Sequence, residues 1–521
     1  MKKYYLSFII AGLTFSGIHA QETTVDDALR YAVENLTGSA RFRGMSGAFG
    51  AIGGDLSAMN QNPAGSLFFN NNYATVTGSI NNIKNSSLYN GTRTNETDSS
   101  LDLNQAGVVF VFNEGSGKTD WKKIALAFNY ENANNLNNSI FSAGTNQYNS
   151  IGNYFVNQAN ANGGIPLELL TLQPGETFFQ LYDYLGTLPD SSYPNVSGFQ
   201  AQQAFLGYTA YIFDSTSPNT YTSNVPGGAH YAQESYLTST GYNGKITGNF
   251  ATQYKDILFL GLNLNAHFSD YVRTTSLYEQ NDSPSTVKVS SIEFDNQLHT
   301  YGSGFSFNLG AIVKIVPQFR VGVAYESPTW YRFTDELTQY VKATSIDGSQ
   351  TFTDVADPQI TNVYAPYKIQ TPAKWTGSAA YLFGKKGLLS IDVSTKDYST
   401  TRFKPKNEYP YGGINGLNHN MSTNLDNAIE VRVGGEYKIK QVSLRGGYHF
   451  DQSPYKVDQT FGDLTGYSGG IGYTFGENRL DLAYSYEHRN MNQALISSGM
   501  PDPARISRYN NNIVISYSIN F

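Results

Sequence analysis

Gly466-Tyr467-Ser468-Gly469-Gly470 is the stretch of the chain that looks most like a catalytic motif, because it matches the G-x-S-x-G pattern of serine hydrolases. In those enzymes the serine sits on a sharp turn between a strand and a helix. Here the motif enters a segment of alternating apolar and polar residues, which is typical of a continuous strand. The seven histidines are scattered, and no H-E-x-x-H, Walker or paired metal-ligand spacing occurs. We therefore expect no enzyme activity, no catalytic residues, no metal and no cofactor.

Three histidines keep one binding function open. His230, His299 and His419 fall in or near long polar segments, and imidazole is a common axial ligand of haem iron. A haem-binding receptor is therefore an alternative function, although isolated histidines in loops are more often simply solvated.

Two arginines are candidate partners for a ligand carboxylate. Arg432 and Arg445 lie on the polar faces of two alternating segments, and a guanidinium group matches a carboxylate with two hydrogen bonds. Acidic residues share those faces, so the charges can also pair across strands and hold the wall together. The acidic residues are Glu430, Glu436, Asp481 and Glu487.

The composition narrows the class of protein that carries these residues. The chain has 521 residues, of which 14% are aromatic and only 15% charged, so it is folded rather than disordered. It has no cysteine, which excludes disulfides and thiolate chemistry. Its net charge of -7 gives no basic surface for nucleic acid. A secreted protein and a membrane barrel are both compatible with these numbers.

The first twenty residues predict export. Lys2 and Lys3 precede an apolar run from Leu6 to Ile18, and Ala20 ends a small-residue cleavage site. Residues 1–20 are therefore predicted to be a signal peptide, with Gln21 as the first mature residue. No later stretch supplies the roughly 20 apolar residues of a membrane-spanning helix.

From about residue 72 the chain is a succession of alternating segments. The last one shows the pattern best, with apolar residues on one face and polar residues on the other. The apolar face holds Ile513, Ile515, Tyr517, Ile519 and Phe521, and the polar face holds Asn512, Ser516, Ser518 and Asn520. Segments of about ten residues with this alternation are typical of strands that cross a bacterial outer membrane.

The connections between these segments alternate in length, short at one end and long at the other, as in outer-membrane barrels. We predict an all-β fold: a transmembrane antiparallel β-barrel of about 14 strands over residues 72–521, with a long extracellular insertion at about 131–235. A secreted sandwich or propeller would not explain this asymmetry. It would also not explain Phe521, the aromatic residue at the chain end that the bacterial barrel-assembly machinery is expected to engage.

Residues 21–71 do not alternate. Val25 to Leu36 has an acidic start and helical spacing, and Ser39 to Ser66 is dense in Gly and Ala. Gly47-Ala48-Phe49, Gly54-Asp55-Leu56-Ser57-Ala58 and Asn62-Pro63-Ala64-Gly65 follow in order. This series resembles the N-terminal hatch of the FadL/TodX-type family of outer-membrane long-chain fatty-acid and hydrophobic-compound transporters. Residues 302–310, 325–328 and 371–373 are also similar to stretches of that family.

The resemblance implies a lumen plugged by the hatch, with Asn62, Pro63 and Ala64 as hatch-motif positions. It also implies passive uptake of long-chain fatty acids or similar hydrophobic small molecules. These molecules would be captured at the extracellular face, the hatch would shift, and they would leave sideways through the barrel wall into the outer-membrane lipid. We expect the protein to be a monomer. In the residues alone, Asn62 and Pro63 can also simply shape a turn. Some barrels that resemble this family serve as scaffolds or shuttles in protein secretion, which is a second alternative function.

The long insertion contains the candidate ligand contacts of the outer face. It clusters aromatic and aliphatic residues at helical spacing, among them Phe178, Phe179, Leu181 and Phe205. These side chains either form an apolar clasp that first captures the ligand, or pack against each other as the core of a cap.

Overall fold

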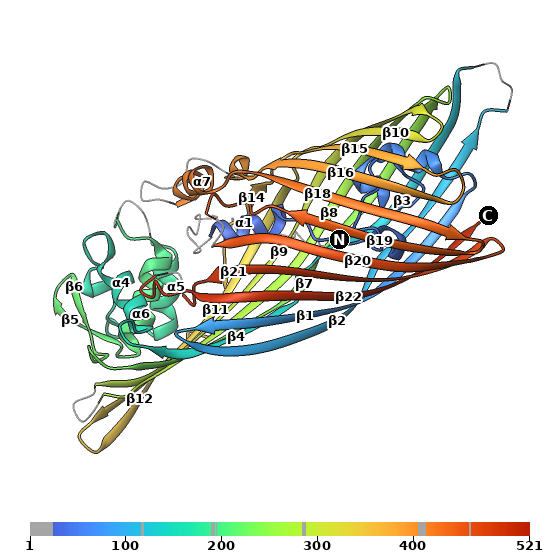
Figure 1. Cartoon of the computed structure of the whole chain (residues 1–521). Helices are drawn as coiled ribbons and strands as arrows, with labels where there is room; N and C mark the ends of the chain where they lie inside the picture. Colours follow the sequence, from blue (N-terminus) through green and yellow to red (C-terminus); the bar gives the residue numbers. More distant parts are fainter. Residues whose placement is uncertain are drawn as a thin grey trace, which may run out of the picture.

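The computed structural model is a closed antiparallel barrel of 14 strands with a helical N-terminal segment inside it, as the sequence predicts (Figure 1). It describes residues 24–115, 119–188, 193, 195–283, 288–404, 413–457, 460–496 and 498–521. The predicted signal peptide, residues 1–20, lies outside the described residues. Among the described helices, none is both long and apolar enough to cross a bilayer.

The wall runs through the strands in chain order and closes where the last strand meets the first. Strand β1 pairs with β22 from Tyr73 opposite Asn520 to Leu88 opposite Arg505. Four positions of the wall are built from two consecutive strands each: β3 with β4, β10 with β11, β14 with β15, and β16 with β17. The wall strands are β1 (Tyr73–Tyr89), β2 (Thr92–Asn113), β3 (Trp121–Asn135), β4 (Asn138–Asn146), β7 (Tyr231–Tyr254), β8 (Leu258–Asn281), β9 (Val289–Val316), β10 (Phe319–Glu326), β11 (Trp330–Asp347), β14 (Tyr367–Gln370), β15 (Lys374–Leu382), β16 (Gly387–Asp397), β17 (Arg402–Lys404), β18 (Asn427–Ile439), β19 (Val442–Asp451), β20 (Phe461–Phe475), β21 (Asn478–Gln493) and β22 (Ala504–Asn520).

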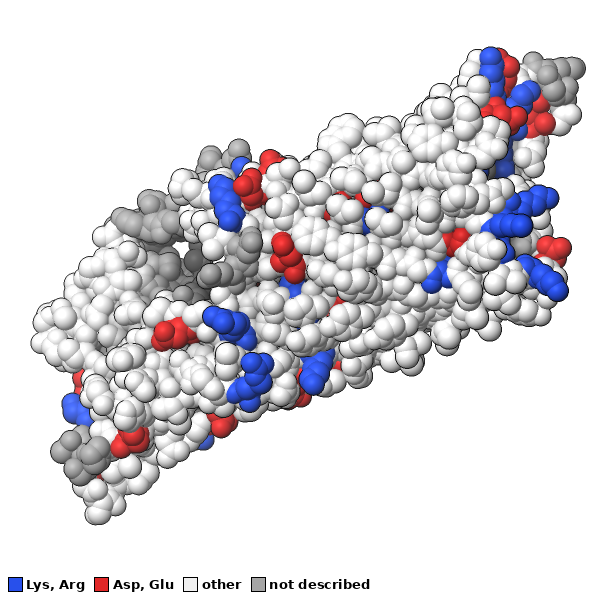
Figure 2. All heavy atoms as spheres, viewed as in Figure 1, with Lys and Arg blue, Asp and Glu red and all other residues white. Residues whose placement is uncertain are grey.

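The two faces of each strand separate lipid from lumen. On β22, Ile515 is 52% exposed on the outer face, whereas Ser516 next to it is 1% exposed and faces inward. The predicted alternation is therefore confirmed, with apolar side chains outward and polar ones inward. Figure 2 shows a band of the outer wall nearly free of charged side chains, with Lys and Arg gathered at the end of the barrel near the C-terminus.

The two ends of the barrel differ in their connections. At one end, here called the turn end, strands are joined by tight turns in which Lys255 and Lys440 adopt φ values of 50° and 57°. At the other, the cap end, the described residues between 147 and 230 form a folded cap (Figure 1). The cap contains α4 (Gly152–Asn160), α5 (Phe178–Gly186), α6 (Gly198–Thr209) and the small hairpin of β5 (Phe213–Ser217) and β6 (Thr220–Ser223).

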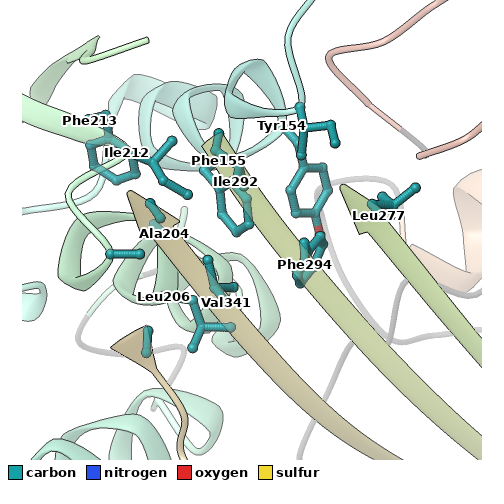
Figure 3. Packing of buried hydrophobic residues seen from close by; sticks show 14 of the residues in the cluster. Tyr154, Phe155, Ala204, Leu206, Ile212, Phe213, Leu277, Ile292, Phe294 and Val341 are labelled. Atoms are coloured by element: carbon teal, nitrogen blue, oxygen red, sulfur yellow. The ribbon is translucent and has the colours of Figure 1, made fainter. Parts of the chain in front are cut away.

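The cap packs onto strands that extend past the barrel rim. The Phe155 ring meets the Phe294 ring of β9 edge to face at 5.0 Å, and Tyr154 lies 5.7 Å from Phe294. Figure 3 shows these rings beside Ile292 and Val341, which come from β9 and β11. The cap is therefore fixed to the barrel by a continuous apolar core.

The N-terminal segment, residues 24–71, lies within the barrel and is called the hatch below (Figure 1). It comprises α1 (Val25–Ala32), α2 (Ala40–Arg43), α3 (Ala58–Gln61) and the 3-10 helix η1 (Pro63–Phe68). Its helices are short because Gly and Pro interrupt them, and side chains satisfy their free amides. Ser39 accepts a hydrogen bond from the Phe42 amide, and Asn62 from the Ala64 amide.

Candidate functional site

Asn62 ties the hatch to the wall. Its Nδ2 donates to the carbonyl of Gly50 at 2.9 Å and to the carbonyl of Ala311 on β9 at 3.1 Å. Pro63 begins η1, and its carbonyl accepts a hydrogen bond from Asn249 of β7 at 3.0 Å. Ala64 is fully buried beneath them. The three hatch-motif positions thus both shape a turn and contact the wall, and their part in gating stays a prediction.

Glycines on the wall make room for this contact. A Cβ atom on Gly310 of β9 would lie 2.1 Å from Oδ1 of Asn62, and one on Gly261 of β8 would lie 2.3 Å from the carbonyl carbon of Pro63. These two glycines are paired across β8 and β9. The wall therefore has a slot in which only a glycine lets the hatch backbone approach.

Polar contacts hold the hatch on the opposite side of the lumen. Arg41 forms an ion pair with Glu436 of β18, with 3.0 Å between Nε and Oε2. Ser468, the serine of the G-x-S-x-G stretch, lies within β20, and its Oγ is 2.8 Å from Oγ of Ser46. The hydroxyl that resembles a nucleophile therefore docks the hatch.

Glu34, two residues after α1, forms ion pairs with two wall lysines and is called the latch below. Its carboxylate oxygens lie 2.5 Å from Nζ of Lys374 on β15 and 2.9 Å from Nζ of Lys396 on β16. Burial raises the pKa of Glu34, but the two ammonium groups outweigh burial and hold that pKa well below its usual range. The carboxyl group is therefore ionised at neutral pH.

The wall is incomplete beside β2. Strand β2 pairs with β3 only from Gln105 to Asn113, so the backbone of its cap-end half, 92–104, has no ladder to β3 or β4 among the described pairings. Strand β4 instead bends inward: Oγ of Ser142 lies 2.7 Å from Oγ of Ser87 on the lumen face of β1. On the outer side Leu101 is 80% exposed. We call this stretch the open seam.

A cavity of about 310 Å³ lies between the hatch and the open seam. Its volume is at the lower end of the range for small-molecule sites. One part of its lining is apolar, with Leu29 and Leu36 from the hatch, Leu136 and Ile140 from the β3–β4 segment, and Leu237 from β7. The rest is polar and rich in asparagine and arginine. The polar lining includes Asn81, Asn104, Asn135, Arg43, Arg489 and Arg508.

The arginines of this cavity are not among the residues predicted from the sequence. Arg489 and Arg508 occupy opposite positions on β21 and β22. Each lies on the lumen face of a strand whose alternation is plain in the sequence. Combining this alternation with the pairing register of the last two strands would have identified them.

The predicted ligand-binding arginines lie elsewhere. Arg445 is fully buried between Glu436 and Asp481, at 2.7 and 2.8 Å. Arg432 lies 3.6 Å from Glu430 and lines a second, smaller cavity of about 80 Å³. Carboxylates of the protein itself thus stand where a ligand carboxylate was expected, and the role of both arginines in binding stays a prediction.

The four predicted contacts in the insertion fall into two groups. Phe205 and Leu181 are buried in the cap core, and the Phe178 ring stacks on Phe205 at 4.8 Å. Phe179 is 53% exposed on the cap surface. Of the four, Phe179 is the side chain available to a ligand arriving from solution.

The three histidines considered for haem lie on separate elements. His230 contacts Asp282, His299 on β9 lies between Asp270 and Glu336, and His419 belongs to α7 (Gly413–Asn424). Within the described part of the chain, no three His, Asp or Glu side chains are grouped as a metal ion requires.

A closed barrel with a lipid-facing wall, a hatch in the lumen and a folded cap defines an outer-membrane barrel built around an internal passage. A family model described as "Outer membrane protein transport protein (OMPP1/FadL/TodX)" matches residues 206–505. The chain belongs to this family, as the hatch motifs indicated. It is therefore an outer-membrane protein of a family of transport proteins.

The comparison with solved structures gave matches that cover nearly the whole chain. A FadL homologue from Pseudomonas aeruginosa is 13% identical, with 94% of this chain and 100% of that chain covered and a TM-score of 0.52. The toluene transporter TodX from Pseudomonas putida is 13% identical, with 94% and 100% covered and a TM-score of 0.47. The toluene transporter TbuX from Ralstonia pickettii is 15% identical, with 94% and 99% covered and a TM-score of 0.46. The comparison with curated protein sequences gave no significant match.

Proposed function

We propose that this protein admits long-chain fatty acids or similarly hydrophobic small molecules passively across the outer membrane. The observation that carries the proposal is the lumen cavity of about 310 Å³ whose lining includes Asn104 and Asn135 at the open seam. A ligand in this cavity has a short route sideways into the bilayer. Neither ATP nor a cofactor is needed for movement down a gradient.

The direction of exit follows from the hatch and from solvation. Toward the turn end, the path is filled by η1, which is docked into the slot of Gly261 and Gly310. Moving an apolar chain into water costs about 0.8 kcal/mol for each CH₂ group, so a route into lipid is strongly favoured over one into the periplasm. The exposed Leu101 beside the open seam continues the apolar surface toward the bilayer.

Capture and hatch movement complete the proposed cycle. Exposed apolar side chains of the cap, including Phe179, offer a first contact for a hydrophobic ligand. The ligand then reaches the cavity, whose hatch side is formed by Leu29, Val33 and Leu36. A shift of the hatch opens this side, and the ligand leaves through the open seam. We further propose that the protein acts as a monomer and is assembled through its last strand, which ends at Phe521.

Uptake of labelled oleate into liposomes that contain the purified full chain tests this proposal. The chain has no cysteine, so the pair Ser46→Cys and Ser468→Cys gives a single disulfide that fixes the hatch to β20. The matched control is Thr376→Cys with Ser394→Cys, whose oxygens are 2.8 Å apart on the paired strands β15 and β16.

We expect saturable uptake by the unmodified chain and by the control. We expect its loss in the oxidised hatch pair and its return on reduction. Absence of oleate binding by folded protein would overturn the proposed cargo and favour the secretion scaffold. Full uptake with the hatch disulfide formed would overturn hatch movement.

A further inference from the structure

Arg489 and Arg508 form a pair of like charges in the cavity wall. They lie directly opposite each other on β21 and β22, an arrangement that destabilises a sheet unless something compensates it. Among the described residues no carboxylate comes within ion-pair distance of either guanidinium. Nε of Arg489 is buried without a hydrogen-bond partner, and its guanidinium lies 4.1 Å from the centre of the Phe461 ring.

A third guanidinium group adds to this charge. Arg43 of the hatch lines the same cavity and is 2% exposed, and its Nε also has no hydrogen-bond partner. It donates a hydrogen bond of 3.1 Å to the neutral hydroxyl of Ser485 on the wall. The acidic group beside it, Glu487, is shared with His449 at 3.5 Å and with Asn510 at 3.1 Å.

Three other arginines of the lumen are paired with carboxylates. Arg445 has Glu436 and Asp481, Arg41 has Glu436, and Arg30 has Asp27. Arg508 is half-buried, and its Nε donates a hydrogen bond of 3.4 Å to the neutral Oδ1 of Asn85. A buried charge without a charged partner is costly, so three guanidinium groups around one cavity favour an anion between them. We call Arg43, Arg489 and Arg508 the arginine triad.

We infer that the arginine triad binds the head group of an anionic amphiphile that carries two negative charges, as a phosphate monoester does. The inference rests on the proposed function and narrows its cargo. Guanidinium groups match phosphate oxygens with paired hydrogen bonds, and a dianion neutralises two of them, whereas a single carboxylate neutralises one. The acyl chain lies against Leu136, Ile140 and Leu237.

Binding of four probes to the full chain in detergent tests the inference. The probes are 1-oleoyl-glycerol-3-phosphate, oleate, the neutral 1-oleoylglycerol and inorganic phosphate, all measured by calorimetry. Arg489→Gln and Arg508→Gln each remove one member of the triad. The matched control is Arg505→Gln, which removes an exposed arginine three residues from Arg508 on the same strand.

We expect the phosphate amphiphile to bind at least about tenfold more tightly than oleate. Each triad variant should lose about tenfold in affinity for the phosphate amphiphile only, because one charge-assisted hydrogen bond is removed. Arg505→Gln leaves all affinities unchanged. Inorganic phosphate that binds as tightly as the amphiphile would assign the site to the free ion and overturn the amphiphile.

Equal affinity for the three oleoyl probes, or unchanged binding in both triad variants, would overturn the inference. In that case saturable oleate uptake would still support the proposed function. Circular dichroism and heat-modified gel mobility confirm that each variant is a folded barrel.

Discussion

Asn135 and Ser100 touch across the open seam: Nδ2 of Asn135 donates a hydrogen bond of 2.9 Å to Oγ of Ser100, although their strands do not pair at that height. The backbone ladder between β2 and β3 stops at Gln105 and Glu131. No backbone ladder in the described part of the chain therefore bridges the opening between the cavity and the bilayer. Hydrogen bonds from side chains cross it, including one from the Thr94 hydroxyl of β2 to the carbonyl of Phe141 on β4.

Closing this bridge covalently is expected to stop lateral exit. The pair Asn135→Cys and Ser100→Cys, oxidised or joined by a short bifunctional thiol reagent, should reduce oleate uptake into liposomes about tenfold or more, because the apolar ligand would otherwise have to cross water. Mass spectrometry confirms the cross-link, and reduction should restore uptake.

The control for this closure is Thr376→Cys with Ser394→Cys, whose oxygens lie 2.8 Å apart on the paired strands β15 and β16. That cross-link should leave uptake unchanged. Normal uptake with the open seam fully cross-linked would place the exit elsewhere.

The glycine slot gives a prediction about the seal of the hatch. Gly310→Ala places a methyl group on Asn62 and should cost about 1–3 kcal/mol of hatch docking, as overpacking does elsewhere. Leakage of small sugars in a liposome-swelling assay should rise. Gly248→Ala on β7 is the control, since no atom lies within 4 Å of the added carbon. Equal leakage from the two variants would show that the slot does not position the hatch.

The sequence predicted the wall well and the passage poorly, for physical reasons. From Asn512 to Asn520 in β22 the polar and apolar residues alternate except at Val514, so the pleat assigns each face. The inward bend of β4 follows Leu136-Asn137, which contains neither Gly nor Pro, and depends on contacts such as Ser87 with Ser142 that join distant segments. Local patterns cannot reveal such contacts.

The same distinction explains the predicted site residues. Asn62 was found because its neighbours form a continuous motif. Arg445 and Arg489 look alike in the sequence, since both sit on polar faces of alternating strands. Only the register between strands shows that Arg445 meets Glu436 whereas Arg489 meets Arg508.

Glu34 predicts how the seal depends on pH. Folding lowers the pKa of Glu34. The stabilisation of hatch docking by Glu34 is therefore fully present above the ordinary pKa of a glutamic acid, and it is lost only as the pH falls through the lowered pKa. Sugar leakage should therefore stay low from pH 7 down to at least about 4.3, the ordinary pKa of a glutamic acid.

Glu34→Gln should leak already at pH 7, because Lys374 and Lys396 lose their shared counter-charge. Its leakage should not change between pH 7 and pH 4. The control is Glu234→Gln, which alters an exposed carboxyl group on β7. If leakage of the unmodified chain rises between pH 6 and pH 5, Glu34 does not act as the latch.

Two phenylalanines of the cap, Phe205 and Phe179, are expected to have different roles, the first in packing and the second in ligand capture. Phe205 is 1% exposed and stacks with Phe178, so Phe205→Ala should destabilise the cap by about 3–5 kcal/mol. Phe179 is 53% exposed, so Phe179→Ser should leave thermal unfolding of the cap unchanged and slow oleate uptake at low ligand concentration, where capture limits the rate. Limited proteolysis reports the folding of the cap, and initial uptake rates report capture. Unchanged rates in a fully folded Phe179→Ser variant would leave the cap with a structural role and contradict the clasp.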